Sequence, residues 1–69
     1  MSTIISVNGA QKATTVTTIT DLLRDENIDL GVRFLAVAIN GTVVPRSKWD
    51  SARINPGDDI EIVRPAPGG

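Results

Sequence analysis

The residue types that most often carry out catalysis are missing from this chain of 69 residues. It contains no cysteine and no histidine. It therefore has no thiolate nucleophile, no disulfide, no soft-metal site and no imidazole to act as a general base. Catalysis would have to depend on Asp, Glu, Lys, Ser or Thr on a very small body. We expect a protein that is not an enzyme and that binds no metal or cofactor of its own.

The last five residues of the sequence offer one reactive group. They are Pro65, Ala66, Pro67, Gly68 and Gly69. The prolines disfavour a helix and favour an extended course, and glycine lets the walls of an enzyme channel close around its backbone. If the chain carries sulfur at all, the Gly69 carboxyl group is the one suited to hold it, as a thiocarboxylate, because the chain has no thiol to hold a persulfide. The alternative is a terminus that simply frays.

The rest of the sequence predicts one small domain over residues 1–64, followed by an extended, flexible tail over residues 65–69. The expected elements are strands at 3–7 and 11–16, a helix from 19 to about 27–29, strands at 34–40 and 42–44, a loop or single helical turn at 46–54, and a last strand at 59–64. This order predicts an α+β fold in two layers, a mixed sheet packed on one helix. With the first and last strands central and parallel, it is the ubiquitin-like β-grasp arrangement.

Local signals support these elements. Asn8-Gly9 and Asn40-Gly41 are typical of two-residue hairpin turns, in which both positions need a positive φ. Thr18 is a predicted N-cap, and Ile19, Leu22 and Leu23 form one apolar stripe at helical spacing. In the second strand, Ala13 and Val16 are the expected buried residues.

The strand predicted at 34–40 is apolar on both faces, which is unusual for an antiparallel strand at the surface of a monomer. One face carries Leu35, Val37 and Ile39, which we expect to pack on the helix. The other face is a candidate partner surface, consisting of Phe34, Ala36 and Ala38 with Val43 and Val63. The alternative is a register shifted by one residue, which would make this second set the core face.

Four further residues are candidates for binding or for structure. Trp49 is predicted to be a packing anchor beneath the loop at 44–54 rather than a binding residue. Arg46 is either solvated or hydrogen-bonded to that loop. Asp58 and Asp59 are interpreted as turn and strand-start residues rather than as metal ligands.

The segment VAINGTVVPRSKW, residues 37–49, resembles the midsection of the ThiS family, where an A-[IVL]-N-G…[IV]-V-P-R…W pattern is typical. NPGDDIEIV at 55–63, VNG at 7–9 and the final Gly-Gly extend the resemblance along the whole chain. The PAPGG ending is closer to MoaD, the carrier of molybdopterin synthesis. MoaD-like chains are usually longer and lack the Val-Pro-Arg-x-x-Trp element, so the midsection favours the thiamine pathway.

The resemblance implies a sulfur carrier that acts as a co-substrate. A ThiF-like adenylating enzyme would use Mg-ATP to activate the Gly69 carboxylate, with residues 65–68 recognised as the tail. Persulfide sulfur from a cysteine desulfurase, directly or by relay, would then give the thiocarboxylate. A ThiG-like thiazole synthase would accept that sulfur. The alternatives are a MoaD-like carrier for molybdopterin synthesis and a ubiquitin-like protein modifier or interaction module.

Composition argues against other partners. The formal net charge is −1 and the isoelectric point about 5.0, with seven Lys and Arg spread along the chain. A nucleic-acid binder would need a clustered basic face. No apolar run approaches the ~20 residues that span a bilayer, and no export leader is visible. We expect a cytoplasmic protein that is monomeric when free.

Overall fold

A computed structural model of the chain describes residues 2–64, and the predicted tail sites at 65–69 lie outside this range. Within the described residues the elements are β1 (Thr3–Val7), β2 (Ala10–Thr14), α1 (Ile19–Asp25), β3 (Ala36–Ile39), β4 (Thr42–Val44), the 3-10 helix η1 (Arg46–Lys48) and β5 (Asp59–Val63). The predicted order of strands and helix is confirmed.

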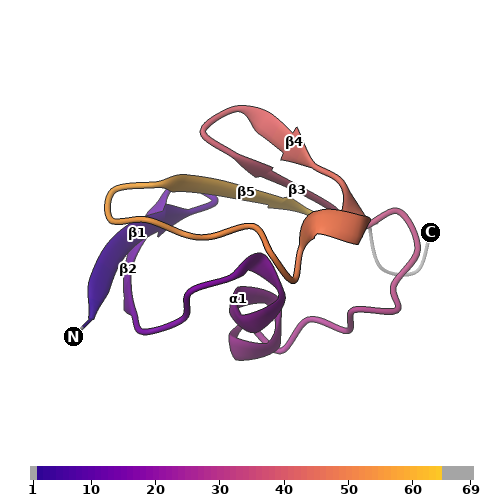
Figure 1. The fold of residues 1–69 in the computed structure, drawn as a ribbon, viewed down its shortest axis with the longest axis horizontal. Coiled ribbons are helices and arrows are strands. Elements are labelled where there is room, and N and C mark those ends of the chain that lie inside the picture. The colour runs from indigo at the N-terminus through magenta and orange to yellow at the C-terminus, as the bar shows by residue number, and fades with distance from the viewer. Residues whose placement is uncertain (1, 65–69) are drawn as a thin grey trace.

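The five strands form one mixed sheet in the order β2-β1-β5-β3-β4. β1 and β5 pair in parallel at its centre, and the other neighbouring strands are antiparallel. Helix α1 covers one face of this sheet (Figure 1). The fold is the predicted ubiquitin-like β-grasp. Its parallel central pair brings the first and last strands of the described chain together.

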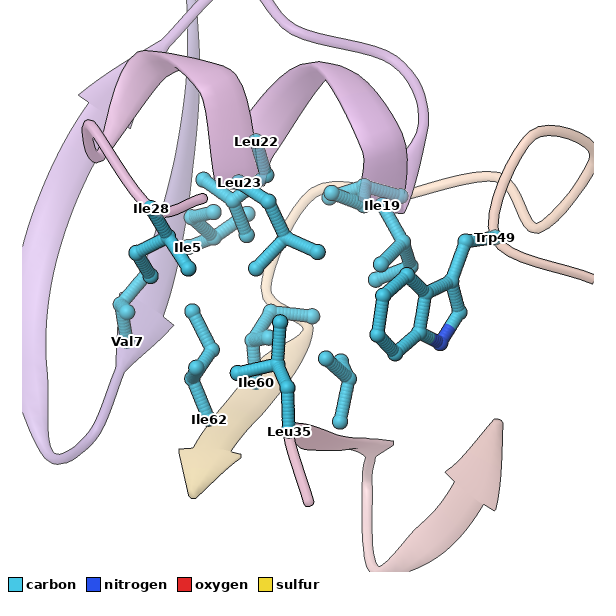
Figure 2. Packing of buried hydrophobic residues seen from close by; sticks show 12 residues of the cluster. Ile5, Val7, Ile19, Leu22, Leu23, Ile28, Leu35, Trp49, Ile60 and Ile62 are labelled. Atoms are coloured by element: carbon cyan, nitrogen blue, oxygen red, sulfur yellow. The ribbon is translucent and has the colours of Figure 1, made fainter. Parts of the chain in front are cut away.

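The hydrophobic core lies between α1 and the sheet. The helical stripe predicted at Ile19, Leu22 and Leu23 is fully buried, and Figure 2 shows these side chains directed toward those of the sheet. The described core consists of Ile5, Val7, Ile19, Leu22, Leu23, Ile28, Leu35, Val37, Trp49, Ile54, Ile60 and Ile62. This core is almost wholly aliphatic, and Trp49 is its single aromatic member.

Helix α1 begins where Thr18 caps it. The Thr18 hydroxyl accepts a hydrogen bond from the Asp21 N–H at 3.3 Å, as the sequence predicts. The Thr20 N–H donates to the Trp49 carbonyl at 3.2 Å, which ties the first turn to the segment after η1. The helix ends at Asp25, two residues before the earliest predicted end. Asn27 has a φ of 59°, a left-handed conformation that stops a helix.

The prediction for β2 was wrong in two respects. The strand spans Ala10–Thr14 rather than 11–16, and Ala13 is exposed rather than buried. The tight turn at Asn8-Gly9 pairs Ile5 with Lys12 and therefore places Lys12 and Thr14 on the helix side of the sheet. Val16 lies after the strand and packs partly against the core.

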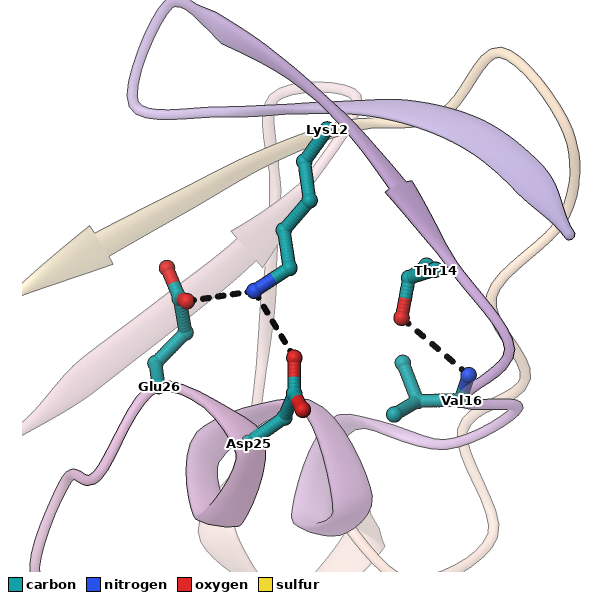
Figure 3. A network of polar contacts seen from close by, with 5 residues as sticks. All are labelled: Lys12, Thr14, Val16, Asp25 and Glu26. Atoms are coloured by element: carbon teal, nitrogen blue, oxygen red, sulfur yellow. Dashed lines mark hydrogen bonds and ion pairs between the residues drawn. The ribbon is translucent and has the colours of Figure 1, made fainter.

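Lys12 joins β2 to the end of α1. Its Nζ atom lies 2.7 Å from Asp25 Oδ2 and 2.6 Å from Glu26 Oε2 (Figure 3). Hydrogen bonds to these two carboxylates raise the pKa of Lys12 above its ordinary value of 10.5. The ion pair therefore fastens the edge strand to the second layer of the fold.

We expect Lys12→Met to lower the free energy of unfolding by no more than ~1 kcal/mol, because the pair is partly exposed. Since the pKa is raised in the folded state, the contribution is complete below about pH 10.5 and is lost as the pH rises through the folded-state value. Urea unfolding of both proteins at about pH 8 and about pH 11 measures this difference. Lys48→Met, an exposed lysine on η1, is the control. If the wild type and Lys12→Met differ in free energy of unfolding by the same amount at both pH values, the ion pair of Lys12 is not the cause of the difference.

Candidate functional site

The outer face of the sheet, defined as the face turned away from α1, carries the predicted partner surface. Val37 is 1% exposed and Leu35 is also buried. Ala36 is exposed and Ala38 is half-buried. Of the two registers that the sequence allows, the structure has the one in which Leu35 and Val37 face the helix. Ala36 and Ala38 consequently lie on the outer face, with Val43 on β4 and Val63 on β5 opposite them.

The outer face is hollowed at β3. Ala38 pairs with Val43 on one side and with Glu61 on the other, and Ala36 pairs with Val63. The small alanine side chains therefore lie between larger ones, of which Val43 is 68% and Val63 60% exposed. The resulting hollow has a volume of about 250 Å³ and is lined by Ala36, Val37, Ala38, Gly41, Val43, Glu61 and Val63. Apart from Glu61, the side chains that line it are apolar or absent.

Phe34 does not line this hollow, and its predicted place in a strand was wrong. β3 begins at Ala36, and Phe34 lies in the preceding turn with a φ of 64°. A positive φ is strained for a bulky residue other than glycine. The ring is nevertheless 83% exposed. Phe34 is thus an apolar side chain presented to solvent two residues before the hollow begins.

Arg46 holds the loop that precedes β3, and the Trp49 ring packs against Arg46. The Arg46 guanidinium donates to the carbonyl of Leu30 and, at 2.8 Å, to that of Val32. It also lies over the Trp49 ring, 4.8 Å from the centroid. Trp49 is buried, and its indole N–H donates to the Val44 carbonyl at 2.9 Å. Trp49 is therefore the packing anchor that was predicted. Arg46 bonds not to its own loop but to the one between α1 and β3.

Two turn asparagines fix the position of β5. Asn8 Oδ1 accepts from the Ile62 N–H at 2.7 Å, and Asn8 Nδ2 donates to the Ile62 carbonyl at 3.2 Å. On the other side, Asn40 Oδ1 accepts from the Asp59 N–H at 2.9 Å. Both asparagines have a φ of 51°, as their predicted turns require. Each side chain thus continues the hydrogen bonding of β5 beyond the end of a neighbouring strand.

Asn40 is itself held by a buried carboxylate. Its Nδ2 donates to Asp58 Oδ1 at 3.0 Å, and the Asn55 N–H donates to Asp58 Oδ2 at 2.8 Å. Asp58 is therefore a structural turn residue, as predicted. Within residues 2–64 no group of three His, Cys, Asp or Glu side chains is placed to hold a metal ion.

The structure brings four of the five predicted surface residues together and adds three that sequence reasoning did not place there, Val37, Gly41 and Glu61. The alternation of DIEIV shows that Glu61 points outward. It does not show that Ala38 and Val43 lie beside it, because that depends on the pairing of three strands.

The predicted tail residues, Pro65 to Gly69, lie outside the described part of the chain. Among residues 2–64 there is no helix with the length and apolar character needed to cross a bilayer.

Comparison with known proteins identifies relatives of the whole domain. The model of the ThiS family matches residues 3–69. The crystal structure of a thiamine biosynthesis protein, ThiS, from Geobacter metallireducens is 25% identical, with a TM-score of 0.77 over 96% of this chain and 99% of that one. A solution structure of a thiamine biosynthesis protein from the same organism has a TM-score of 0.78 at 25% identity, over 96% and 87% of the two chains. None of the curated proteins matches the chain in sequence.

Proposed function

The chain belongs to the ThiS family, and on this premise we propose that it is a sulfur carrier of thiamine biosynthesis that acts in the cytoplasm. The observation that carries the proposal is the family match, which extends from residue 3 through Gly69 and so includes the Gly-Gly ending. The two solved structures support the pathway, since both are of thiamine biosynthesis proteins. The carrier is a co-substrate of its partner enzymes and catalyses no step itself.

The proposed chemistry takes place at Gly69. A ThiF-like enzyme uses Mg-ATP, and the Gly69 carboxylate attacks the α-phosphorus with loss of pyrophosphate. The sulfur of a persulfide, supplied by a cysteine desulfurase or a relay protein, then attacks the acyl carbon and AMP leaves. A thiol cleaves the remaining sulfur–sulfur bond and leaves Gly69 as a thiocarboxylate. A ThiG-like thiazole synthase accepts this sulfur.

The outer face is the proposed docking surface for these enzymes. Its hollow lies between the exposed side chains of Val43 and Val63, with the strongly exposed Phe34 two residues before Ala36. Exposed apolar groups gathered in this way mark interaction sites in monomeric proteins. Val63 also ends β5, so a partner bound at the hollow lies close to the point where the chain continues toward Pro65 and Gly69.

The test is the mass of the carrier after reaction. Purified protein is incubated with the ThiF-like enzyme, Mg-ATP, a cysteine desulfurase and cysteine. We expect the mass to change by one oxygen-to-sulfur exchange, and fragmentation should place this exchange at Gly69. Omission of ATP is the control and should leave the mass unchanged. The absence of this product with the cognate enzyme, whichever sulfur donor is supplied, would overturn the proposal.

A second candidate is a MoaD-like carrier of molybdopterin synthesis, which the Pro-rich ending at residues 65–67 favours. The thiocarboxylate form distinguishes the two pathways. Incubated separately with a thiazole synthase and with the large subunit of a molybdopterin synthase, it should lose its sulfur only to the enzyme of its own pathway.

A further inference from the structure

The outer face carries negative charge and no positive charge among the described strand residues. The outward side chains alternate with the buried ones, and they are Ile4, Ser6, Gln11, Ala13, Ala36, Ala38, Val43, Asp59, Glu61 and Val63. Two of them are carboxylates, and none is a lysine or an arginine. The composition of the face is therefore apolar and acidic.

Two of the described cations are engaged elsewhere. Lys12 lies on the helix side of the sheet, where it pairs with Asp25 and Glu26. Arg46 is directed to the carbonyls of Leu30 and Val32. No ion pair within residues 2–64 involves Glu61. The Glu61 carboxylate thus faces solvent beside an apolar hollow.

This arrangement restricts what can cover the hollow. A purely apolar surface that seals it would remove the Glu61 carboxylate from water without a partner, which costs several kcal/mol. A second copy of this chain, docked by the same face, would bring Glu61 and Asp59 toward their own equivalents, and like charges facing each other oppose association. The same repulsion acts against nucleic acids. A partner surface that inserts an apolar group and carries a cation opposite Glu61 avoids both the burial of an unpaired carboxylate and the repulsion between like charges.

We propose that Glu61 determines the specificity of this docking surface by pairing with an arginine or lysine on an otherwise apolar surface of the adenylating enzyme. The inference rests on the proposed function, which requires that enzyme to bind the chain and reach Gly69. Gly69 is eight residues beyond Glu61, a span of at most about 28 Å when fully extended. The active site of the enzyme therefore lies within that distance of Glu61 in the complex.

The test compares Glu61→Gln and Glu61→Lys with Asp59→Asn. Asp59 lies two residues away on the same strand and the same face, so Asp59→Asn and Glu61→Gln change the net charge equally. The readout is ATP–pyrophosphate exchange by the purified ThiF-like enzyme of the same organism. We expect KM for the carrier to rise about tenfold with Glu61→Gln and about a hundredfold with Glu61→Lys, with kcat unchanged. Asp59→Asn should stay within about twofold of the wild type.

The dependence of KM on salt concentration provides an independent test of the ion pair. An ion pair weakens as ionic strength rises, so the wild-type KM should increase with added NaCl more steeply than that of Glu61→Gln. Because Glu61 is exposed, the thermal midpoints of all variants should agree, which excludes misfolding as the cause.

The outcomes separate the two proposals. If the wild type supports exchange and Glu61→Gln has the same KM, the role of Glu61 is overturned and the proposed function stands. If Asp59→Asn raises KM as much as Glu61→Gln, the enzyme responds to overall charge, and the specific pair is again overturned. If the wild type supports no exchange, the proposed function fails and this inference fails with it.

Discussion

Deletion of Gly69 should abolish adenylation of the chain and leave its thermal unfolding unchanged. The deletion moves the carboxylate back by one residue, about 3.5 Å, whereas even a displacement of about 1 Å can cost a hundredfold in rate. The described core and sheet lie between Thr3 and Val63, so we expect the fold to keep its stability. ATP–pyrophosphate exchange measures the first effect and circular dichroism the second.

Gly69→Ala is the matched variant for this experiment, because it keeps the carboxylate in place and adds only a Cβ. If the enzyme channel closes tightly around glycine, we expect exchange to fall by about a hundredfold rather than to vanish. Full exchange by the deletion variant would show that Gly69 is not the acceptor of AMP. A large drop in the thermal midpoint would instead show that Gly69 contributes to the fold.

Trp49→Ala should lower the free energy of unfolding by about 3–5 kcal/mol. It would remove the one aromatic side chain of the described core, the indole hydrogen bond to the Val44 carbonyl and the surface on which Arg46 rests. A domain of this length has a total stability of roughly 3–10 kcal/mol, so a large part of the variant would be unfolded at room temperature. Urea unfolding followed by circular dichroism measures the change.

Trp49→Phe separates the two contributions of this residue. It keeps most of the buried area and loses the hydrogen bond that the indole N–H donates to Val44, for which we expect a loss of about 1–2 kcal/mol. A loss below about 1 kcal/mol for Trp49→Ala would contradict the view that the Pro-Arg-x-x-Trp element is a structural anchor.

The elements that could be predicted from the sequence are those whose signals are local. Asn8-Gly9 and Asn40-Gly41 determine their own turns because both residues must adopt a positive φ, and they do. The spacing of Ile19, Leu22 and Leu23 is enough to identify the buried face of α1. These signals, together with the order of elements, were sufficient for the β-grasp fold.

What could not be predicted depends on contacts between distant residues. Ala13 is exposed because the turn pairs Lys12, and not Ala13, with the buried Ile5. The loop before β3 is held by Arg46, which lies 14 to 16 residues from its carbonyl partners. The bond from Asn8 to Ile62 spans 54 residues. No local pattern contains such information.

The candidate site was likewise predictable where the signal is local and not where it depends on strand pairing. Alternation within 34–40 was enough to group Ala36 with Ala38, and apolar character was enough to add Val43 and Val63. Phe34 was misplaced because its turn conformation breaks the alternation. Glu61 was not recognised as part of the site, because only the pairing of β5 with β3 brings it to the hollow.

The two asparagine contacts to β5 have a mechanical consequence. Under the proposed function, an enzyme that draws the chain beyond Arg64 into its active site would exert tension along β5. β5 is hydrogen-bonded to β1 on one side and β3 on the other, and Asn8 and Asn40 extend these bonds to Ile62 and Asp59. A force along β5 acts perpendicular to the hydrogen bonds that join it to β1 and β3. These bonds would therefore share the force, instead of breaking one after another. A pull on the end of β5 is therefore resisted by both neighbouring strands together.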